Sequence, residues 1–205
     1  MISLRPEVYA NKNLKEALEI KRADAESIHD ARVYLRKYYD VLSSFYPIYE
    51  NSECLYLAKE AISALGKVRD MDICQIKDKK RDQLAIRALG RVKKLKGCYI
   101  NRVCCSRLLA YNNILKIYLE INDVNDFHEL RKKVRKARNL VESLGFESKE
   151  IKVLAKKMGD TRDDILRLEC KGLKPYEINI VPYRDEAKKT IGKILLIQNE
   201  FHHFL

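Results

Sequence analysis

The sequence predicts an all-α protein built from two helical-bundle halves. The chain has 205 residues, among them only 7 Gly and 4 Pro, so few positions suit the hairpin turns of an antiparallel sheet. It is 34% charged and 46% hydrophobic, and its apolar residues recur at spacings of three and four, as on amphipathic helices. A chain of this length can bury a sizeable core, as one large domain or two small ones.

The expected helices of the first half cover residues 14–22, 24–46, 52–66 and 79–120, the last with a break near Gly90 or Gly97. Asp24 or Ser27 can cap the second helix, and Pro47 ends it. The third helix should end near Gly66, and a short helix should follow the polar phrase that begins at this glycine.

The polar run at residues 122–126 is the expected boundary between the halves. It divides the chain into a first repeat of about 10–121 and a second of about 122–205. The expected elements of the second half are a helix over 126–144 that ends at Gly145, a helix from Ser148 to Gly159, a loop over 171–182 with an extended stretch at 177–181, and a last helix from Tyr183.

A basic phrase occurs twice, and each copy precedes a second related phrase. Residues 29–36 read HDARVYLR, and residues 128–135 read HELRKKVR. Downstream, residues 66–72 read GKVRDMD and residues 159–164 read GDTRDD. The repetition in the same order predicts two equivalent halves, each aiming a cationic face at one anionic ligand.

Helical rotation places both cationic faces beside buried stripes. At about 100° per residue, one arc of roughly 80° holds His29, Arg32, Arg36 and Tyr39 in the first copy, and His128, Arg131, Arg135 and Arg138 in the second. The apolar stripes are Ile28, Ala31, Leu35, Tyr38, Leu42 and Phe45, and Leu130, Val134, Ala137, Val141 and Leu144. The cations therefore border the buried seam, and we expect them to line the edge of a groove.

The charge balance favours an anionic partner. The net charge is +12, spread evenly over both halves, which indicates a cationic surface built into the fold. The planar donors of Arg suit phosphate oxygens, and His adds a donor whose charge depends on pH. We expect Asp70, Asp72, Asp163 and Asp164 to be structural, as carboxylates that complement the dipole of a helix N-terminus.

The six cysteines do not form a recognisable metal or disulfide pattern. None belongs to a CxxC pair, and Cys104 and Cys105 are adjacent. Most have apolar helical neighbours, so buried free thiols are expected. The N-terminus lacks the apolar core of a signal peptide and no run has the length of a membrane span, so we expect a cytoplasmic protein with no membrane contact.

With these residues assembled, the chain resembles the CHAD family, named for its histidines in an α-helical domain. The first phrase is similar to the family pattern His-Asp-x-Arg-Val-x-x-Arg, and the second to His-x-Leu-Arg-x-x-x-Lys/Arg-x-x-Arg. The closing phrase Gly-x-x-Arg-Asp-x-Asp matches in the first half. The resemblance covers roughly residues 10–204, with four elements in the family's order.

The resemblance implies a single domain of two helical bundles related by pseudo-twofold symmetry, with a basic groove or pore between them. Family members bind inorganic polyphosphate, so the expected function is non-catalytic polyphosphate binding without a cofactor, in some cells at polyphosphate granules. Sulfate or phosphate should fit the same site. The residues implicated are His29, Arg32, Arg36, Arg69, His128, Arg131, Arg135, Arg138 and Arg162.

Two positions depart from the family pattern. Tyr39 stands where the first repeat often has a further Arg, and the second closing phrase carries its second acid, Asp164, one place early. The second half is therefore richer in cations through Arg138, and we expect it to dominate binding.

Two other functions compete with polyphosphate binding. The charge and the 12 Tyr are compatible with nucleic-acid binding, although the sequence contains no zinc finger or RNA-recognition motif. His29-Asp30 is compatible with a metal-dependent phosphohydrolase. Such a site needs further ligands, and the arginines around His29 and His128 would repel a metal cation.

Overall fold

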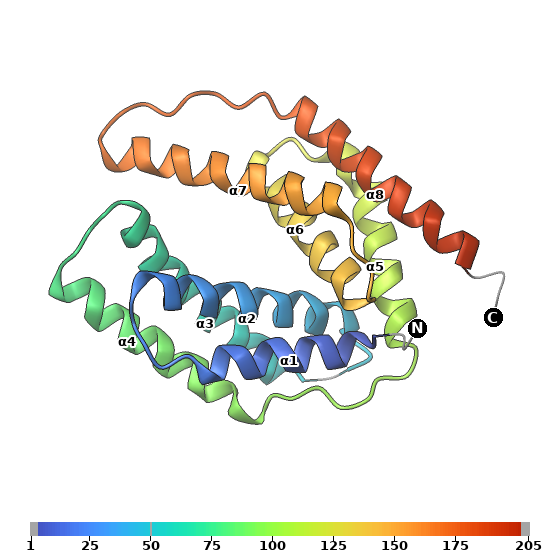
Figure 1. Cartoon of the computed structure of the whole chain (residues 1–205), viewed down its shortest axis with the longest axis horizontal. Helices are drawn as coiled ribbons and strands as arrows, with labels where there is room; N and C mark the ends of the chain where they lie inside the picture. Colours follow the sequence, from blue (N-terminus) through green and yellow to red (C-terminus); the bar gives the residue numbers. More distant parts are fainter. Residues whose placement is uncertain (1–3, 50, 202–205) are drawn as a thin grey trace. The chain divides into compact units, whose positions relative to one another are not determined.

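A computed structural model describes residues 4–49 and 51–201, with side chains described as far as Leu196. Within these residues the protein consists of eight α-helices and two short 3-10 helices and contains no strand, so the predicted all-α class is confirmed (Figure 1). None of the described helices is both long enough and apolar enough to cross a membrane.

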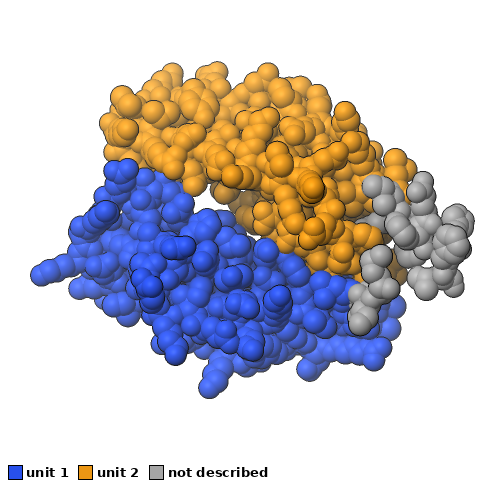
Figure 2. All heavy atoms as spheres, viewed as in Figure 1, with its two compact units in different colours: residues 1–106 blue, residues 107–205 orange. Residues whose placement is uncertain are grey.

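The chain divides into two compact units, residues 1–106 and 107–205 (Figure 2). The elements of unit 1 are α1 (Pro6–Glu19), α2 (Ala25–Phe45), α3 (Ser52–Ile73), α4 (Lys79–Lys93) and the 3-10 helix η1 (Lys94–Gly97). The remaining elements are α5 (Ser106–Glu120), the 3-10 helix η2 (Ile121–Asp123), α6 (Phe127–Ser143), α7 (Lys149–Cys170) and α8 (Val181–Phe201). The two units divide at the start of α5, between Ser106 and Arg107, whereas the proposed sequence repeats divide within η2, at about residues 121 and 122.

Side-chain caps fix the starts of the helices that carry the basic phrases. Asp24 accepts a hydrogen bond from the Ser27 amide at 2.9 Å, so Asp24 is the cap of α2. Asp126 does the same for α6 through the Glu129 amide at 2.7 Å, and Ser148 caps α7. At the other end of α6, Gly145 has a φ of +84°, the left-handed conformation predicted for that position.

The predicted start of α1 and the predicted end of α3 are wrong. Helix α1 begins at Pro6 rather than near residue 14, because proline is well suited to a first helical position and Ala10, Leu14 and Ala17 bury one face. Helix α3 continues through Gly66 to Ile73. A glycine inside a helix costs about 1 kcal/mol, which is less than the burial of Val68 and Ile73 returns.

Helix α7 likewise continues through a glycine, and this contradicts the role expected for the four acidic residues of the closing phrases. Gly159 lies inside α7, so Asp163 and Asp164 are mid-helical, while Asp70 and Asp72 lie near the C-terminal end of α3. None of the four is beside a helix N-terminus, and the helix-dipole explanation is wrong.

The two apolar stripes predicted on the phrase-bearing helices are confirmed. Every residue of both stripes is at most 4% exposed: Ile28, Ala31, Leu35, Tyr38, Leu42 and Phe45 on α2, and Leu130, Val134, Ala137, Val141 and Leu144, which follow α6 to its end. Helix α2 packs against α1 and α3, and α6 packs against α7. In α8, Ala187, Ile191, Ile194 and Leu195 are buried as expected.

The cysteines behave differently from the sequence expectation. Cys54 on α3 and Cys98, just after η1, form a disulfide, with both residues 6% exposed. The buried Tyr38 hydroxyl donates to the Cys98 carbonyl at 2.6 Å, which ties α2 to the same point. Cys104 and Cys105 are free thiols, but they are exposed rather than buried. The prediction failed because the pairing of Cys54 with Cys98 depends on tertiary contact and has no local signature.

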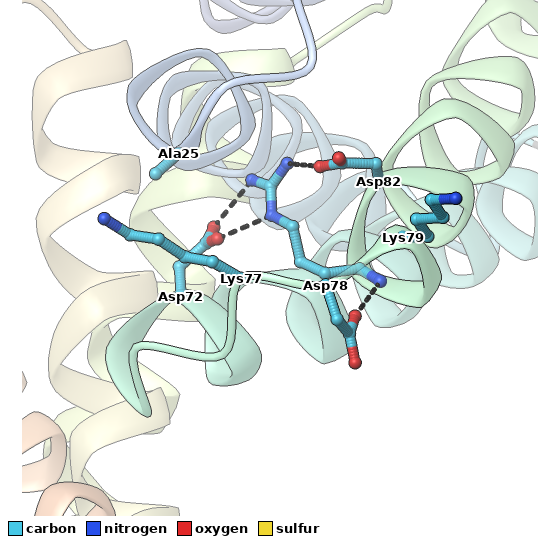
Figure 3. A pocket seen from close by; sticks show the side chains of 7 residues that line it. Ala25, Asp72, Lys77, Asp78, Lys79 and Asp82 are labelled. Atoms are coloured by element: carbon cyan, nitrogen blue, oxygen red, sulfur yellow. Dashed lines mark hydrogen bonds and ion pairs between the residues drawn. The ribbon is translucent and has the colours of Figure 1, made fainter.

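Asp72 has a structural role that differs from the predicted one. The Arg81 side chain is 8% exposed and donates to Asp72 through Nε at 2.8 Å and through Nη2 at 3.2 Å (Figure 3). Arg81 also donates to the Ala23 carbonyl, which lies just before α2. The hydrogen bonds that Arg81 donates to Asp72 raise the pKa of Arg81, and this buried pair joins α3, α4 and the start of α2.

The buried pair predicts a large effect of Asp72→Ala on stability. The substitution strands the Arg81 guanidinium in a dry site, and we expect the free energy of unfolding to fall by about 3–5 kcal/mol. Urea unfolding followed by circular dichroism measures the loss. Asp82→Ala is the matched control, because Asp82 also pairs with Arg81, at 3.2 Å, but is 71% exposed. The control should lose less than about 1 kcal/mol, and equal losses would contradict the assignment.

Candidate anion-binding sites

In unit 1 the two phrases of the first half meet at Gly66. Arg32 comes from α2, and Gly66 lies on the face of α3 that packs against α2. A Cβ built at Gly66 would lie 3.1 Å from Arg32 Nη2 and 3.4 Å from its Nε. The guanidinium therefore lies directly over the α3 backbone, and the absence of a side chain at position 66 makes room for it.

This contact explains why residue 66, three positions before Arg69, is a glycine. A larger residue would push the Arg32 head away from α3, and Arg32 would no longer be held in one orientation. The corresponding position of the second half is different, because no atom outside the helix's own backbone lies within 4 Å of a Cβ at Gly159. The two halves share the sequence phrase but not this packing.

In unit 2 the two phrases meet around His128. Arg131 and Lys132 follow it on α6, and Arg162 approaches from α7; all three act electrostatically on the imidazole. Partial burial is the largest effect on the pKa of His128 and lowers it. The charges of Lys132 and Arg131 lower it further, Asp126 opposes them, and Arg162 adds to the lowering. We call His128, Arg131, Lys132 and Arg162 the His128 cluster.

The carboxylate that acts on His128 is Asp126, and its Oδ1 already accepts the Glu129 amide as the cap of α6. Arg162 Nη1 is buried and has no hydrogen-bond partner. Three cations and a buried donor beside one imidazole form a site at which an anion would relieve repulsion.

The other predicted cations lie at the edge of the buried apolar stripes, where helical rotation places them. Arg36, Arg69, Arg131 and Arg135 are half-buried, His29 is exposed, and His128 is exposed over part of its surface. Arg138 donates to Asn139 at 3.2 Å and lies 3.5 Å from the Glu142 carboxylate, so its charge is partly compensated. The roles of these predicted cations in anion binding stay predictions.

Lys132 was missed among the predicted site residues. It stands four residues after His128, a spacing that places two side chains on the same side of a helix. That spacing identifies it, whereas the arginines that match between the two phrases do not, because the first phrase has Val33 at the corresponding place.

No protein-family model matches the chain, and no curated protein or solved structure is similar to it. Among the residues with described placement, no three His, Cys, Asp or Glu side chains gather as a metal site would require.

The difference between the two phrase glycines predicts opposite effects of alanine. Gly159→Ala should raise the free energy of unfolding by about 0.5–1 kcal/mol, because a helical glycine is replaced where the added methyl meets open space. Gly66→Ala should gain less than this or lose stability, because the methyl displaces the Arg32 guanidinium. Thermal and urea unfolding of both variants measure the difference, and equal stabilisation would rule out the Arg32 contact.

The His128 cluster predicts a measurable pKa shift. The imidazole should titrate below its ordinary value of about 6.5, and Lys132→Gln should raise its pKa. NMR titration of the ring protons reads both values. Lys152→Gln is the matched control, because Lys152 is paired with Glu147 on the same unit and should leave the pKa of His128 unchanged.

The lowered pKa of His128 makes the free energy of unfolding depend on pH. Folding disfavours the protonated imidazole, so the stability that neutral His128 permits is present above the unfolded pKa and is lost as the pH falls through the folded pKa. Wild-type protein should therefore lose more stability than His128→Gln between about pH 7 and pH 5.

Proposed function

We propose that this protein binds inorganic polyphosphate without catalysing its breakdown. The observation that carries the proposal is the His128 cluster, in which three cations surround one imidazole and Asp126 is the opposing carboxylate that acts on it. A linear anion with closely spaced charges satisfies several of these donors at once, which a single small anion does less well.

The physical basis is the release of counterions combined with directed hydrogen bonds. A polyanion carries condensed cations, and each protein charge that replaces one contributes a favourable entropy of release. Arg131 and Arg162 add planar donors that fit phosphate oxygens. The buried Nη1 of Arg162 is a donor that such an oxygen would satisfy.

We propose further that the two units act as equivalent halves, each presenting one cationic face to the polymer. The repeated phrases and the family resemblance support this part of the proposal. In unit 1 the two phrases are in contact, with Arg32 over Gly66; in unit 2 Arg162 of the second phrase acts electrostatically on His128 of the first. A groove between the halves, with polyphosphate granules as a cellular location, belongs to the same proposal.

Polyphosphate binding predicts a strong dependence on salt and on the two cluster arginines. Arg131→Ala/Arg162→Ala should weaken binding of a long polyphosphate about 100-fold, at roughly 1.5 kcal/mol for each lost charge-assisted contact. The slope of log K against log salt should become shallower by about 0.7 per removed charge. Fluorescence anisotropy with labelled polyphosphate at two salt concentrations measures both quantities.

The matched control removes the same net charge elsewhere on α7. Lys152→Ala/Arg167→Ala deletes two cations that are paired with Glu147 and Asp164. It should change affinity by less than threefold. Equal losses in the two double variants would show that net charge alone drives binding. Equal affinity for orthophosphate and a long polyphosphate would contradict the proposal.

Single-stranded RNA is the necessary competitor. Bases stack on exposed aromatic rings, and the exposed tyrosines include Tyr46, Tyr56, Tyr99 and Tyr176, whereas Tyr38 on the first phrase helix is fully buried. None of these rings belongs to the His128 cluster, so we expect polyphosphate to displace RNA at physiological salt. If RNA displaces polyphosphate, the anion that the site selects is a nucleic acid.

A further inference from the structure

The segment that follows η1 holds two exposed thiols at a fixed place in unit 1. Cys104 and Cys105 form a turn just before α5, and their sulfur atoms lie 3.5 Å apart. Both are free, whereas Cys54 and Cys98 of the same unit are joined in a disulfide. The pair is separate from the cationic residues of the proposed function.

The backbone on both sides of the two thiols is anchored to α1. Asn11 donates to the Ile100 carbonyl at 2.8 Å and accepts from the Ile100 amide at 2.7 Å. Arg5 donates to the Val103 carbonyl at 3.0 Å, and Glu7 accepts from the Val103 amide at 3.4 Å. The backbone just before Cys104 is therefore fixed at residues 100 and 103.

Glu7 reinforces this anchor as a buried carboxylate. Burial opposes its ionisation, but hydrogen bonds from the backbone, from Ser106 and from Arg5, together with the charge of Arg5, hold the pKa of Glu7 below its usual value. The charged carboxylate ties Ser106, the residue after the thiol pair, to the first turn of α1. Both thiols are thus presented to solvent from a backbone fixed at residues 103 and 106.

The sulfur separation fits chelation better than disulfide formation. Adjacent residues have Cα atoms about 3.8 Å apart, below the 4.4–6.8 Å that disulfides ordinarily span, and the sulfurs would have to approach to about 2.05 Å. Two thiolate bonds of about 2.3 Å to one central atom would instead meet at an angle of about 99° across the observed 3.5 Å. That angle suits a pyramidal trivalent centre.

We propose that Cys104 and Cys105 are a chelating site for thiophilic trivalent metalloids, of which organic arsenicals are the simplest class. No third His, Cys, Asp or Glu joins the two sulfurs within the described part of the chain, so the site supplies two bonds and the third stays with the group that the metalloid carries. With phenylarsine oxide, two As–S bonds form, the As–O bonds break, and both thiol protons leave with the oxygen as water. No oxidant or reductant takes part.

The two thiols are hydrogen-bonded to each other in the free site, with their sulfur atoms 3.5 Å apart, and this bond is the main cause that raises the pKa of Cys105. Both thiol protons leave with the arsenical oxygen as water, so chelation releases no net proton.

The test measures phenylarsine oxide binding by intact-mass spectrometry and by competition titration on the full chain, treated briefly with a phosphine reductant and desalted. We expect one arsenical per wild-type chain with loss of one water. Binding should be weaker by about 100-fold in Cys104→Ser and in Cys105→Ser, because each loses the chelate effect. Serine at these exposed positions should leave the melting temperature unchanged.

Cys104→Ser/Cys105→Ser is the matched control, since it retains Cys54 and Cys98 and undergoes the same reduction. It should bind no arsenical. A stoichiometric adduct in this double variant, or single variants that bind as tightly as wild type, would overturn the proposal. So would protein isolated without reductant in which neither thiol reacts with a maleimide, because the pair would then be a disulfide at rest.

Discussion

The partial burial of arginines beside an apolar stripe is the constraint on which the rest of this molecule depends. Helices α2 and α6 each bury one side completely, and the neighbouring positions carry cations that are neither in the core nor fully in water. A guanidinium at such a margin loses part of its hydration and must be held by packing or by a counter-charge. Arg32 packs over the bare backbone of Gly66.

The His128 cluster meets the same constraint in another way. There the cations act on an imidazole and do not lie over a glycine, and partial burial followed by the charges of Lys132 and Arg131 lowers the pKa of His128. Arg138 shows a third outcome, since Glu142 and Asn139 partly compensate it within its own helix. The sequence predicted that Arg138 would make the second half the stronger one. In the structure, Lys132 and Arg162 act electrostatically on His128, whereas the charge of Arg138 is partly compensated by Glu142.

The features that were predicted correctly from the sequence are those that depend on short-range interactions. The stripes of α2 and α6, the Asp24 cap and the Gly145 terminus depend on residues within one or two turns, and all were correct. The ends of α3 and α7 were wrong, because burial on another helix outweighs the preference of Gly66 and Gly159 for an ending. The Cys54–Cys98 disulfide and the Asp72–Arg81 pair join separate helices, and no local pattern announces them.

The anchoring of residues 100–106 on α1 also has a topological consequence. Arg5 and Glu7 near the start of unit 1 bind Val103 and Ser106 at its end, so the chain enters and leaves this unit at one place. A unit with adjacent ends can be inserted into a loop of another protein, or permuted to new termini, with little strain on either partner. In unit 1 the bonds of Arg5 and Glu7 to Val103 and Ser106 make this closure.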